Sequence, residues 1–370
     1  MGIDRKEDIL RRPTRRWYLT GAAAIGLLLL TGCAATRAHV RAGEASVSAA
    51  ATACAPEEGL AFLCGTGAAE EVVAIPGTPW LISSALHLGA PATLHLIDRV
   101  TARVKPLTPH VAAEPPSGDC PGPPDFTRWS TDGLAARRDM DGRVQLYAAN
   151  HGDRQAIEFL ALRRVGNDAV LTWTGCARMP AGTLANAIAI NGDAIIITSF
   201  HDPADAQAWQ RLARAQPVSS VWQWRAGTGF SRLPFGPLSG ANGVAISPDR
   251  RQIYVSAWAE GAIAVLDRDT GAVRRIRPGF LPDNLHLTSD GKLLVAGQVT
   301  SPAAIAGCGA QCPQPWRVAT FDPARETFET IATGAGSVTV NYACGAQVIG
   351  DRLWITVRGA DRIAWRSSRL

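Results

Sequence analysis

The sequence predicts an all-β fold, a six-bladed β-propeller made of four-stranded antiparallel blades. Two observations lead to this prediction. Between Gly240 and Gln298, short runs rich in Val, Ile and Tyr alternate with turn segments such as Ser-Pro-Asp and Ser-Asp-Gly, which is typical of strands joined by tight turns. The pattern then restarts, because Ala241-Asn242-Gly243 before one turn is echoed by Pro282-Asp283-Asn284 before the next. A repeat of about 40 residues with about four strands is typical of a propeller blade.

The same alternation divides most of the chain into six units. Unit by unit, the predicted strands are Glu71–Ile75, Pro79–Ser83, Ala92–Ile97 and Ala102–Val104; Gly133–Arg137, Val144–Ala149, Gln155–Leu162 and Ala169–Thr174; Ala185–Ile190, Ala194–Thr198 and Ser220–Trp224; Val244–Ile246, Gln252–Ala257 and Ala262–Asp267; Asn284–Leu287, Leu293–Ala296, Trp316–Phe321 and Thr327–Ile331; Gly345–Ile349, Leu353–Val357 and Arg362–Trp365. We expect irregular segments at Pro106–Asp125, at His201–Gln216 with a short helix, and at Thr300–Pro315. Residual strands near the N-terminus are expected to complete the last blade and close the ring.

Composition narrows the possible functions. The chain has 370 residues, enough for one large domain with a substantial core. Its net charge of +5 lies largely in the first 41 residues. No basic patch interleaved with aromatic residues is present, so nucleic acid is not expected as a partner. Beyond the N-terminus, no apolar run is long enough to span a bilayer.

The N-terminus has the pattern of an export signal. Arginines precede the apolar segment Leu19–Leu30, which ends in Leu30-Thr31-Gly32-Cys33. This ending resembles a bacterial lipobox, which implies cleavage before Cys33 and a lipid on its thiol. Arg15-Arg16 also resembles a twin-arginine signal, and an ordinary Sec signal is the alternative. We therefore expect a signal peptide at 1–32, a flexible tether at 33–53 and a propeller at 54–370, anchored to a membrane of the bacterial envelope and facing the periplasm or the exterior.

Export would place the remaining cysteines in an oxidising compartment, where disulfides form. Eight cysteines less Cys33 leave seven, so at least one thiol stays free or pairs between chains. Cys308 and Cys312 are close enough in sequence to bridge a loop locally. A zinc site is not expected, because no second Cys or His pair stands at a suitable spacing.

Polar residues recur where the first strand of a unit begins. In a propeller those strand starts lie beside the central channel, so their side chains can converge on one axis. The residues at these starts are Glu70 or Glu71 in unit one, Asn186 in unit three, Asn242 in unit four, and Asp283 with Asn284 in unit five. Carboxylate and amide oxygens in such numbers suit a hard divalent cation, calcium above all. The alternative is that Asn and Asp precede strands merely because they are good turn residues.

Several motifs together resemble a known family, the paraoxonase/arylesterase group within the wider superfamily of gluconolactonase, regucalcin and strictosidine synthase-like propellers. The motifs are Ala69-Glu70-Glu71-Val72, Ala149-Asn150-His151-Gly152, Leu184-Ala185-Asn186-Ala187, the stretch from Gly240 to Asp249, and Leu281-Pro282-Asp283-Asn284-Leu285. The resemblance implies a six-bladed propeller with calcium in its channel and hydrolysis of lactones or aryl esters.

Carried over residue by residue, the resemblance implies a calcium site, a base and a pocket residue. The implied calcium ligands are Glu70, Asn186, Asn242, Asp283 and Asn284. His151 matches the histidine usually proposed as the base, and a histidine in that role would take a proton from water. His201 matches a polar position near the substrate pocket. His286, two residues beyond Asn284, is expected to face the same channel.

The chain also departs from the family. The family has a second histidine near the position of Thr172, and this chain has none there, so a histidine dyad is not implied. In the family, an aspartate at the position of Ala187 and the residue at the position of Glu71 bind a second calcium, and this chain lacks that aspartate. The family's disulfide between the chain ends lacks its late cysteine. No Gly-x-Ser-x-Gly elbow is present, which excludes a typical serine hydrolase.

We therefore expect a calcium-dependent hydrolase of small lactones or esters. Two alternatives remain: a non-catalytic propeller lipoprotein that binds a ligand or partner, and a propeller with other chemistry, such as a sugar lactonase that uses another divalent ion. The sequence does not indicate an oligomeric state.

Overall fold

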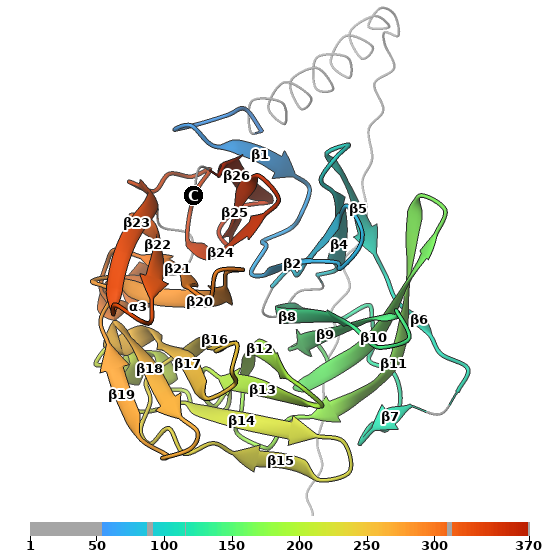
Figure 1. Cartoon of the computed structure of the whole chain (residues 1–370), viewed down its shortest axis with the longest axis horizontal. Helices are drawn as coiled ribbons and strands as arrows, with labels where there is room; N and C mark the ends of the chain where they lie inside the picture. The colour runs from blue at the N-terminus through green and yellow to red at the C-terminus, as the bar shows by residue number, and fades with distance from the viewer. Residues whose placement is uncertain (1–53, 87–91, 115, 309–312, 369–370) are drawn as a thin grey trace, which may run out of the picture. The chain divides into compact units, whose positions relative to one another are not determined.

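Six β-sheets arranged around a central channel make up the described residues of the computed structural model, which are 54–86, 92–114, 116–308 and 313–368 (Figure 1). The predicted signal peptide, tether and lipidated Cys33 lie outside these residues. Each sheet is one blade, and one edge strand of each blade, its inner strand, lies nearest the channel (Figure 1). The predicted six-bladed β-propeller of four-stranded antiparallel blades is confirmed.

The first three blades follow the chain in order. Blade one contains β2 (Val72–Ala74), β3 (Trp80–Ser83), β4 (Leu94–Asp98) and β5 (Arg103–Leu107). Blade two contains β8 (Thr131–Arg138), β9 (Val144–Asn150), β10 (Ala156–Val165) and β11 (Asp168–Arg178), with the short β6 (His110–Val111) and β7 (Ser117–Gly118) pairing parallel to β11. Blade three contains β12 (Ala185–Asn191), β13 (Ala194–Ser199), β14 (Ser220–Arg225) and β15 (Gly229–Arg232). The segment expected to be irregular, Pro106–Asp125, thus contributes two edge strands to blade two.

The last three blades complete the ring. Blade four contains β16 (Ala241–Ile246), β17 (Gln252–Ala257), β18 (Ala262–Asp267) and β19 (Val273–Ile276), with the short helix η1 (Trp258–Glu260) after β17. Blade five contains β20 (Leu281–Leu287), β21 (Leu293–Gln298), β22 (Trp316–Asp322) and β23 (Thr327–Gly334). Blade six contains β24 (Ala343–Ile349), β25 (Arg352–Val357), β26 (Arg362–Ser367) and β1 (Ala61–Cys64). As predicted, an N-terminal strand, β1, completes the last blade by pairing antiparallel with β26.

Two insertions carry the longer helices of the described residues, and both follow the second strand of a blade. The helix α2 (Ala208–Leu212) lies in the predicted insertion after β13, and α3 (Pro302–Cys308) lies in the insertion after β21, where no helix was predicted. The two helices contact each other. None of the helices in the described part of the chain is long and apolar enough to cross a membrane.

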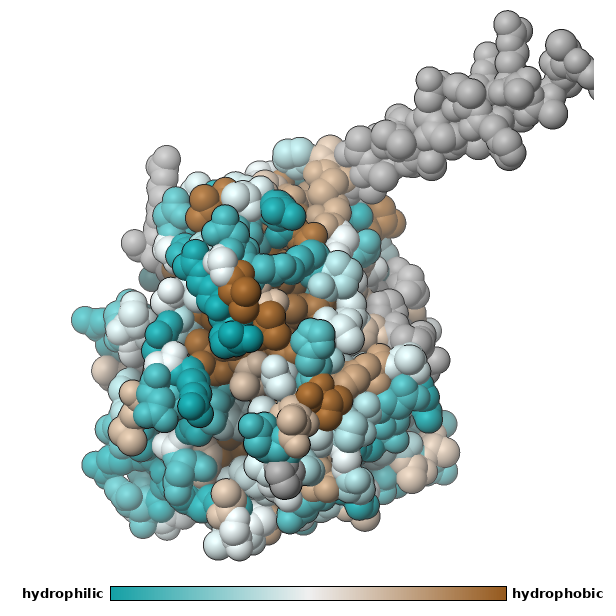
Figure 2. All heavy atoms as spheres, turned by 90° about the vertical axis from the view of Figure 1, so that its right-hand side faces the viewer, coloured by the Kyte–Doolittle hydropathy of each residue, from teal (hydrophilic) through white to brown (hydrophobic). Residues whose placement is uncertain are grey.

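The core lies between blades rather than at one centre. Its apolar clusters each combine side chains of neighbouring blades, as alternating strands that pack face to face require. For example, the Phe159 ring of blade two lies 5.0 Å from the Trp224 ring of blade three. On the side of the molecule seen in Figure 2, polar residues dominate and apolar residues gather toward the middle.

Two disulfides among the described residues join cysteines 10 and 56 positions apart. Cys54 pairs with Cys64, and Cys120 pairs with Cys176, while Cys344 is free and buried. Cys308 is also disulfide-bonded, and its predicted partner Cys312 lies outside the described residues. The expectation of at least one unpaired thiol is met by Cys344.

Candidate metal centre in the channel

The inner strands share a local irregularity at the end of the channel where they begin. In β8, β12, β16, β20 and β24 the pairing register shifts within the first few residues. Such a bulge leaves residues unpaired and turns their side chains out of the sheet's regular alternation. The residues skipped in these shifts include Asp132, Asn186, Asn242, Asp283 and Asn284. Glu70 lies two residues before Val72, the first residue of β2.

Close packing of neighbouring blades explains the glycines beside these residues. A Cβ at Gly133 would lie 2.1 Å from Asn186 O, and a Cβ at Gly243 would lie 2.5 Å from Asp283 O. Neither distance is possible for a real side chain, so the inner strands can approach this closely only through glycine. The Asn-Gly at 242–243 therefore serves ring packing as well as turn formation.

Hydrogen bonds bring the predicted ligands together across the ring. We call Glu70, Asn186, Asn242, Asp283 and Asn284 the oxygen set. The Asn284 amide of blade five donates to Glu70 Oε1 of blade one at 3.4 Å and to its backbone oxygen at 3.1 Å. The Asn242 amide lowers the pKa of Asp283 by a side-chain interaction. These contacts join residues of blades one, four and five. Asn186 of blade three is connected to them through Asp132, whose Oδ2 lies 3.3 Å from the Asn186 amide nitrogen and whose charge acts on Glu70.

The oxygen set leaves acceptors without partners. Glu70, Asn186, Asn242 and Asp283 are between 1% and 8% exposed. One side-chain oxygen of each, namely Glu70 Oε2, Asn186 Oδ1, Asn242 Oδ1 and Asp283 Oδ1, is buried and accepts no hydrogen bond from the described residues. Buried polar atoms are normally paired, and unpaired ones call for a bound ion or water. Four such oxygens from four blades fit a hard cation that binds oxygen ligands.

The donor types fit calcium better than zinc. Among the described residues, no three His, Cys, Asp or Glu side chains are grouped so that they could hold a metal alone. A site here must therefore mix two carboxylates with three amides, and amide oxygens are ligands for hard cations such as calcium rather than for zinc.

The metal-free fold favours the neutral form of both carboxyl groups in the oxygen set. Burial, and then the negative charges of Asp132 and Asp283, raise the pKa of Glu70 well above its ordinary value. Burial raises the pKa of Asp283 to about 7, although the hydrogen bond from Gln298 acts in the opposite direction. A divalent cation would reverse this effect, because it favours the ionised form of both groups.

Gln298 orients Asp283. Its amide donates to Asp283 Oδ2 at 2.8 Å and to Ala343 O at 2.9 Å, and its oxygen accepts from Trp258 Nε1 at 2.9 Å. The side chains of Gln298, Asp283 and Trp258 are almost fully buried. Asp283 Oδ2 is therefore engaged by Gln298, while Oδ1 has no hydrogen-bond partner among the described residues.

His151 lies in the loop after β9, and both of its ring nitrogens face acceptors. Nδ1 lies 2.8 Å from Gln155 Oε1, and Nε2 lies 3.3 Å from Asp132 Oδ2. The backbone N–H of His151 donates to Ser130 O at 2.8 Å, which fixes the loop against β8. The His151 side chain is only 1% exposed. It is thus a buried, oriented member of a pair with Asp132 rather than a free loop histidine.

Asp132 is the functional candidate that sequence reasoning missed. Its Oδ2 also lies 3.3 Å from the Asn186 amide nitrogen, so Asp132 connects His151 to the oxygen set. Thr131-Asp132-Gly133 stands at the start of the inner strand of blade two, in the same bulge position as Asn186 and Asn242. That matching position was the signal that could have identified it.

A second pair lies next to the set. Glu71 Oε2 is 3.1 Å from His286 Nε2, and His286 Nδ1 is 2.8 Å from Ala346 O. Burial by itself lowers the pKa of His286, but the charge and hydrogen bond of Glu71 and the Ala346 carbonyl raise it overall. His286 therefore takes up the carboxylate that the family resemblance associates with a second calcium.

His201 lies away from these contacts. It follows β13, its Nδ1 is 2.9 Å from Asp202 O, and its ring lies 5.6 Å from the Phe200 ring and 6.3 Å from the Trp209 ring. Trp209 belongs to α2 and is 39% exposed. The role of His201 in a substrate pocket stays a prediction.

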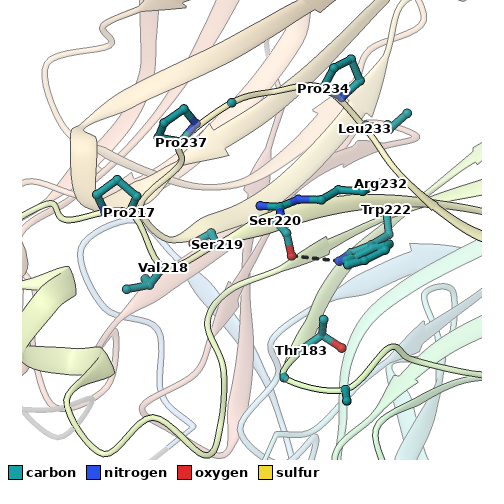
Figure 3. Close-up of a pocket in the computed structure, with 13 residues that line it drawn as sticks. Thr183, Pro217, Val218, Ser219, Ser220, Trp222, Arg232, Leu233, Pro234 and Pro237 are labelled. Carbon is teal, nitrogen blue, oxygen red and sulfur yellow. Dashed lines mark hydrogen bonds between the residues drawn. The ribbon is translucent and has the colours of Figure 1, made fainter.

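Two large cavities lined by described residues lie outside the oxygen set. One, of about 750 Å³, lies at the rim of blade three and is lined by Thr183, Trp222, Arg232 and several prolines (Figure 3). The other, of about 790 Å³, is lined by His286, Lys292 and residues of blades five and six. Neither includes a residue of the oxygen set. Buried oxygens without a hydrogen-bond partner indicate a ligand-binding site more directly than an open cavity does. We therefore place the candidate site in the channel.

Comparison with known proteins agrees with this fold. No family model matches the chain, and no curated protein matches it. Among solved structures, a gluconolactonase from Xanthomonas campestris is 21% identical with a TM-score of 0.53, and the likeness covers 84% of this chain and 89% of that one. A luciferin-regenerating enzyme is 13% identical with a TM-score of 0.54, over 84% of this chain and 96% of that one. Identities this low show the fold alone: the chain is a six-bladed β-propeller of the type found in gluconolactonase.

Proposed function

We propose that this protein is a calcium-dependent hydrolase of lactones or aryl esters. The observation that carries the proposal is the group of four buried oxygens, from four blades, that accept no hydrogen bond from the described residues. The gluconolactonase among the structures with this fold supports the same reaction class. Glu70, Asn186, Asn242, Asp283 and Asn284 would hold the ion. A calcium ion held there would supply positive charge that polarises a carbonyl group.

The pair of His151 and Asp132 is the proposed base. Gln155 accepts from the His151 Nδ1–H, so Nε2 is directed to Asp132. A proton taken from water would be shared between Nε2 and the Asp132 carboxylate, and the hydroxide so formed would attack the carbonyl carbon. The pair would then return the proton to the leaving oxygen. One water is consumed, and a lactone yields a hydroxy acid.

The test uses the purified protein and a panel of lactones and aryl esters. We expect about one calcium per chain by mass spectrometry, hydrolysis that EDTA abolishes, and loss of both in the Asn242→Ala/Asp283→Ala double variant. Asp141→Asn, which removes an exposed carboxylate outside the channel, is the matched control and should behave as wild type. Full activity in EDTA would contradict the proposal.

The second candidate function is a non-catalytic binding propeller. The burial of His151 and the engagement of both its nitrogens favour it, since a base must reach substrate or water. Calcium bound without hydrolysis of any panel member would support this alternative over the enzyme.

We also propose that the protein is exported and anchored through lipid on Cys33. The N-terminal pattern and the disulfides Cys54–Cys64 and Cys120–Cys176 support an oxidising compartment. Cys33→Ala should move the exported protein from the membrane fraction to the soluble fraction.

A further inference from the structure

Arg358 is a cation at the same end of the channel as the oxygen set. It is the first residue after β25, and its backbone N–H donates to Tyr342 O at 3.2 Å, beside the start of β24. Its guanidinium carbon lies 5.8 Å from the centre of the buried Tyr342 ring. This half-buried side chain therefore packs on the Tyr342 ring, beside the start of the inner strand of blade six.

The guanidinium faces carboxylates without pairing with one. It interacts electrostatically with Glu70 and Asp132 and with Asp283, which belong to three other blades. Among the described residues, however, no carboxylate lies within 4.0 Å of its nitrogens. Its N–H groups are not among the buried atoms without a hydrogen-bond partner, so they are open to solvent and available to an acceptor on a ligand.

The charges of the site define what that ligand should be. Glu70 and Asp283 would face a bound cation, and Asp132 is engaged by His151 and Asn186. The planar Arg358 guanidinium then remains available as a cation at the channel end, and its paired N–H groups match the geometry of a carboxylate.

We propose that Arg358 is a substrate-binding residue that pairs with a carboxylate on the substrate, so that the preferred lactones or esters carry a negative charge. This inference rests on the proposed function. It names a substrate class and leaves the hydrolytic step itself unchanged.

The test compares a charged and a neutral substrate that differ in one group. The probes are 4-nitrophenyl hydrogen glutarate and its methyl ester, 4-nitrophenyl methyl glutarate. We expect Arg358→Met to lower kcat/KM for the charged ester by roughly 10- to 100-fold, mainly through KM, and to change the neutral ester less than about 3-fold. Arg358→Lys should recover part of the loss, and Arg366→Met, on the exposed part of β26, should have no effect.

Equal losses for both esters, or none, would overturn the inference, and melting curves will separate these results from unfolding. If no variant hydrolyses either ester, glutarate binding by calorimetry decides instead. Binding by wild type that Arg358→Met abolishes supports carboxylate recognition although the hydrolase proposal fails. No glutarate binding by wild type overturns the inference.

Discussion

Replacing Asp283 by Asn should stabilise the metal-free protein while removing its metal affinity. Asp283 is 1% exposed, and burial raises its pKa from the ordinary 3.8 to about 7. The difference corresponds to roughly 4 kcal/mol of free energy needed to ionise the group in the metal-free fold. Asn has nearly the same shape and no charge, so the variant avoids this cost.

The effect has a definite pH dependence. Because the folded-state pKa is higher than the unfolded one, the metal-free fold holds a proton that the unfolded chain has released. The stability linked to that proton is complete below about pH 3.8 and is lost as the pH rises through about 7. Between pH 5 and pH 8, metal-free wild type should lose roughly 3 kcal/mol from this group, and Asp283→Asn should not.

Melting curves in EDTA at pH 5 and pH 8 measure this. At roughly 2 °C per kcal/mol for a domain of this size, we expect the pH-dependent fall in Tm to be about 6 °C smaller in Asp283→Asn than in wild type. Asp141→Asn should fall as wild type does. Added calcium should then raise the Tm of wild type and leave Asp283→Asn unchanged. Equal pH dependence in the two proteins, together with no response to calcium, would refute the reasoning.

Three further predictions concern neighbouring residues. Gln298→Leu should weaken calcium binding by about 10- to 100-fold in a calcium titration, because Asp283 loses its orienting donor; unchanged affinity would exclude that role. His151→Gln should lower kcat by about 100-fold or more with calcium affinity preserved, and an unchanged kcat in steady-state assays would remove it from the mechanism. The raised pKa of His286 adds stability below its ordinary 6.5 that is lost as the pH rises through the folded value. In Glu71→Gln, the fall in melting temperature between pH 5.5 and pH 8.5 should therefore be smaller than in wild type. The pKa of His286, followed by NMR, should also be lower in the variant.

The pattern of short apolar runs predicted most strands well, because the alternation of a strand and the residues of a turn depend on positions close together in the sequence. It failed for β15 (Gly229–Arg232) and β19 (Val273–Ile276), the outermost strands of their blades. Both are largely exposed or half-buried, so they carry little of the apolar alternation by which strands are predicted. The oxygen set was predictable for the same local reason, since Asn or Asp recurs at one position of several repeats and Glu70 stands at that position of the first. Its role as a metal site stays a prediction.

The sequence by itself determined the blades, their order and the residue types at each strand start, since these depend on contacts a few positions apart. Only the tertiary structure decided which side chains meet. Asn284 reaches Glu70 across 214 positions, Asp132 and His286 bond to residues of other blades, and Arg358 lies near carboxylates of other blades. The physical reason is ring closure. Once β1 pairs with β26, the ends of six separate inner strands share one channel. The residue pattern within a single blade does not indicate which side chains of other blades will lie next to its own.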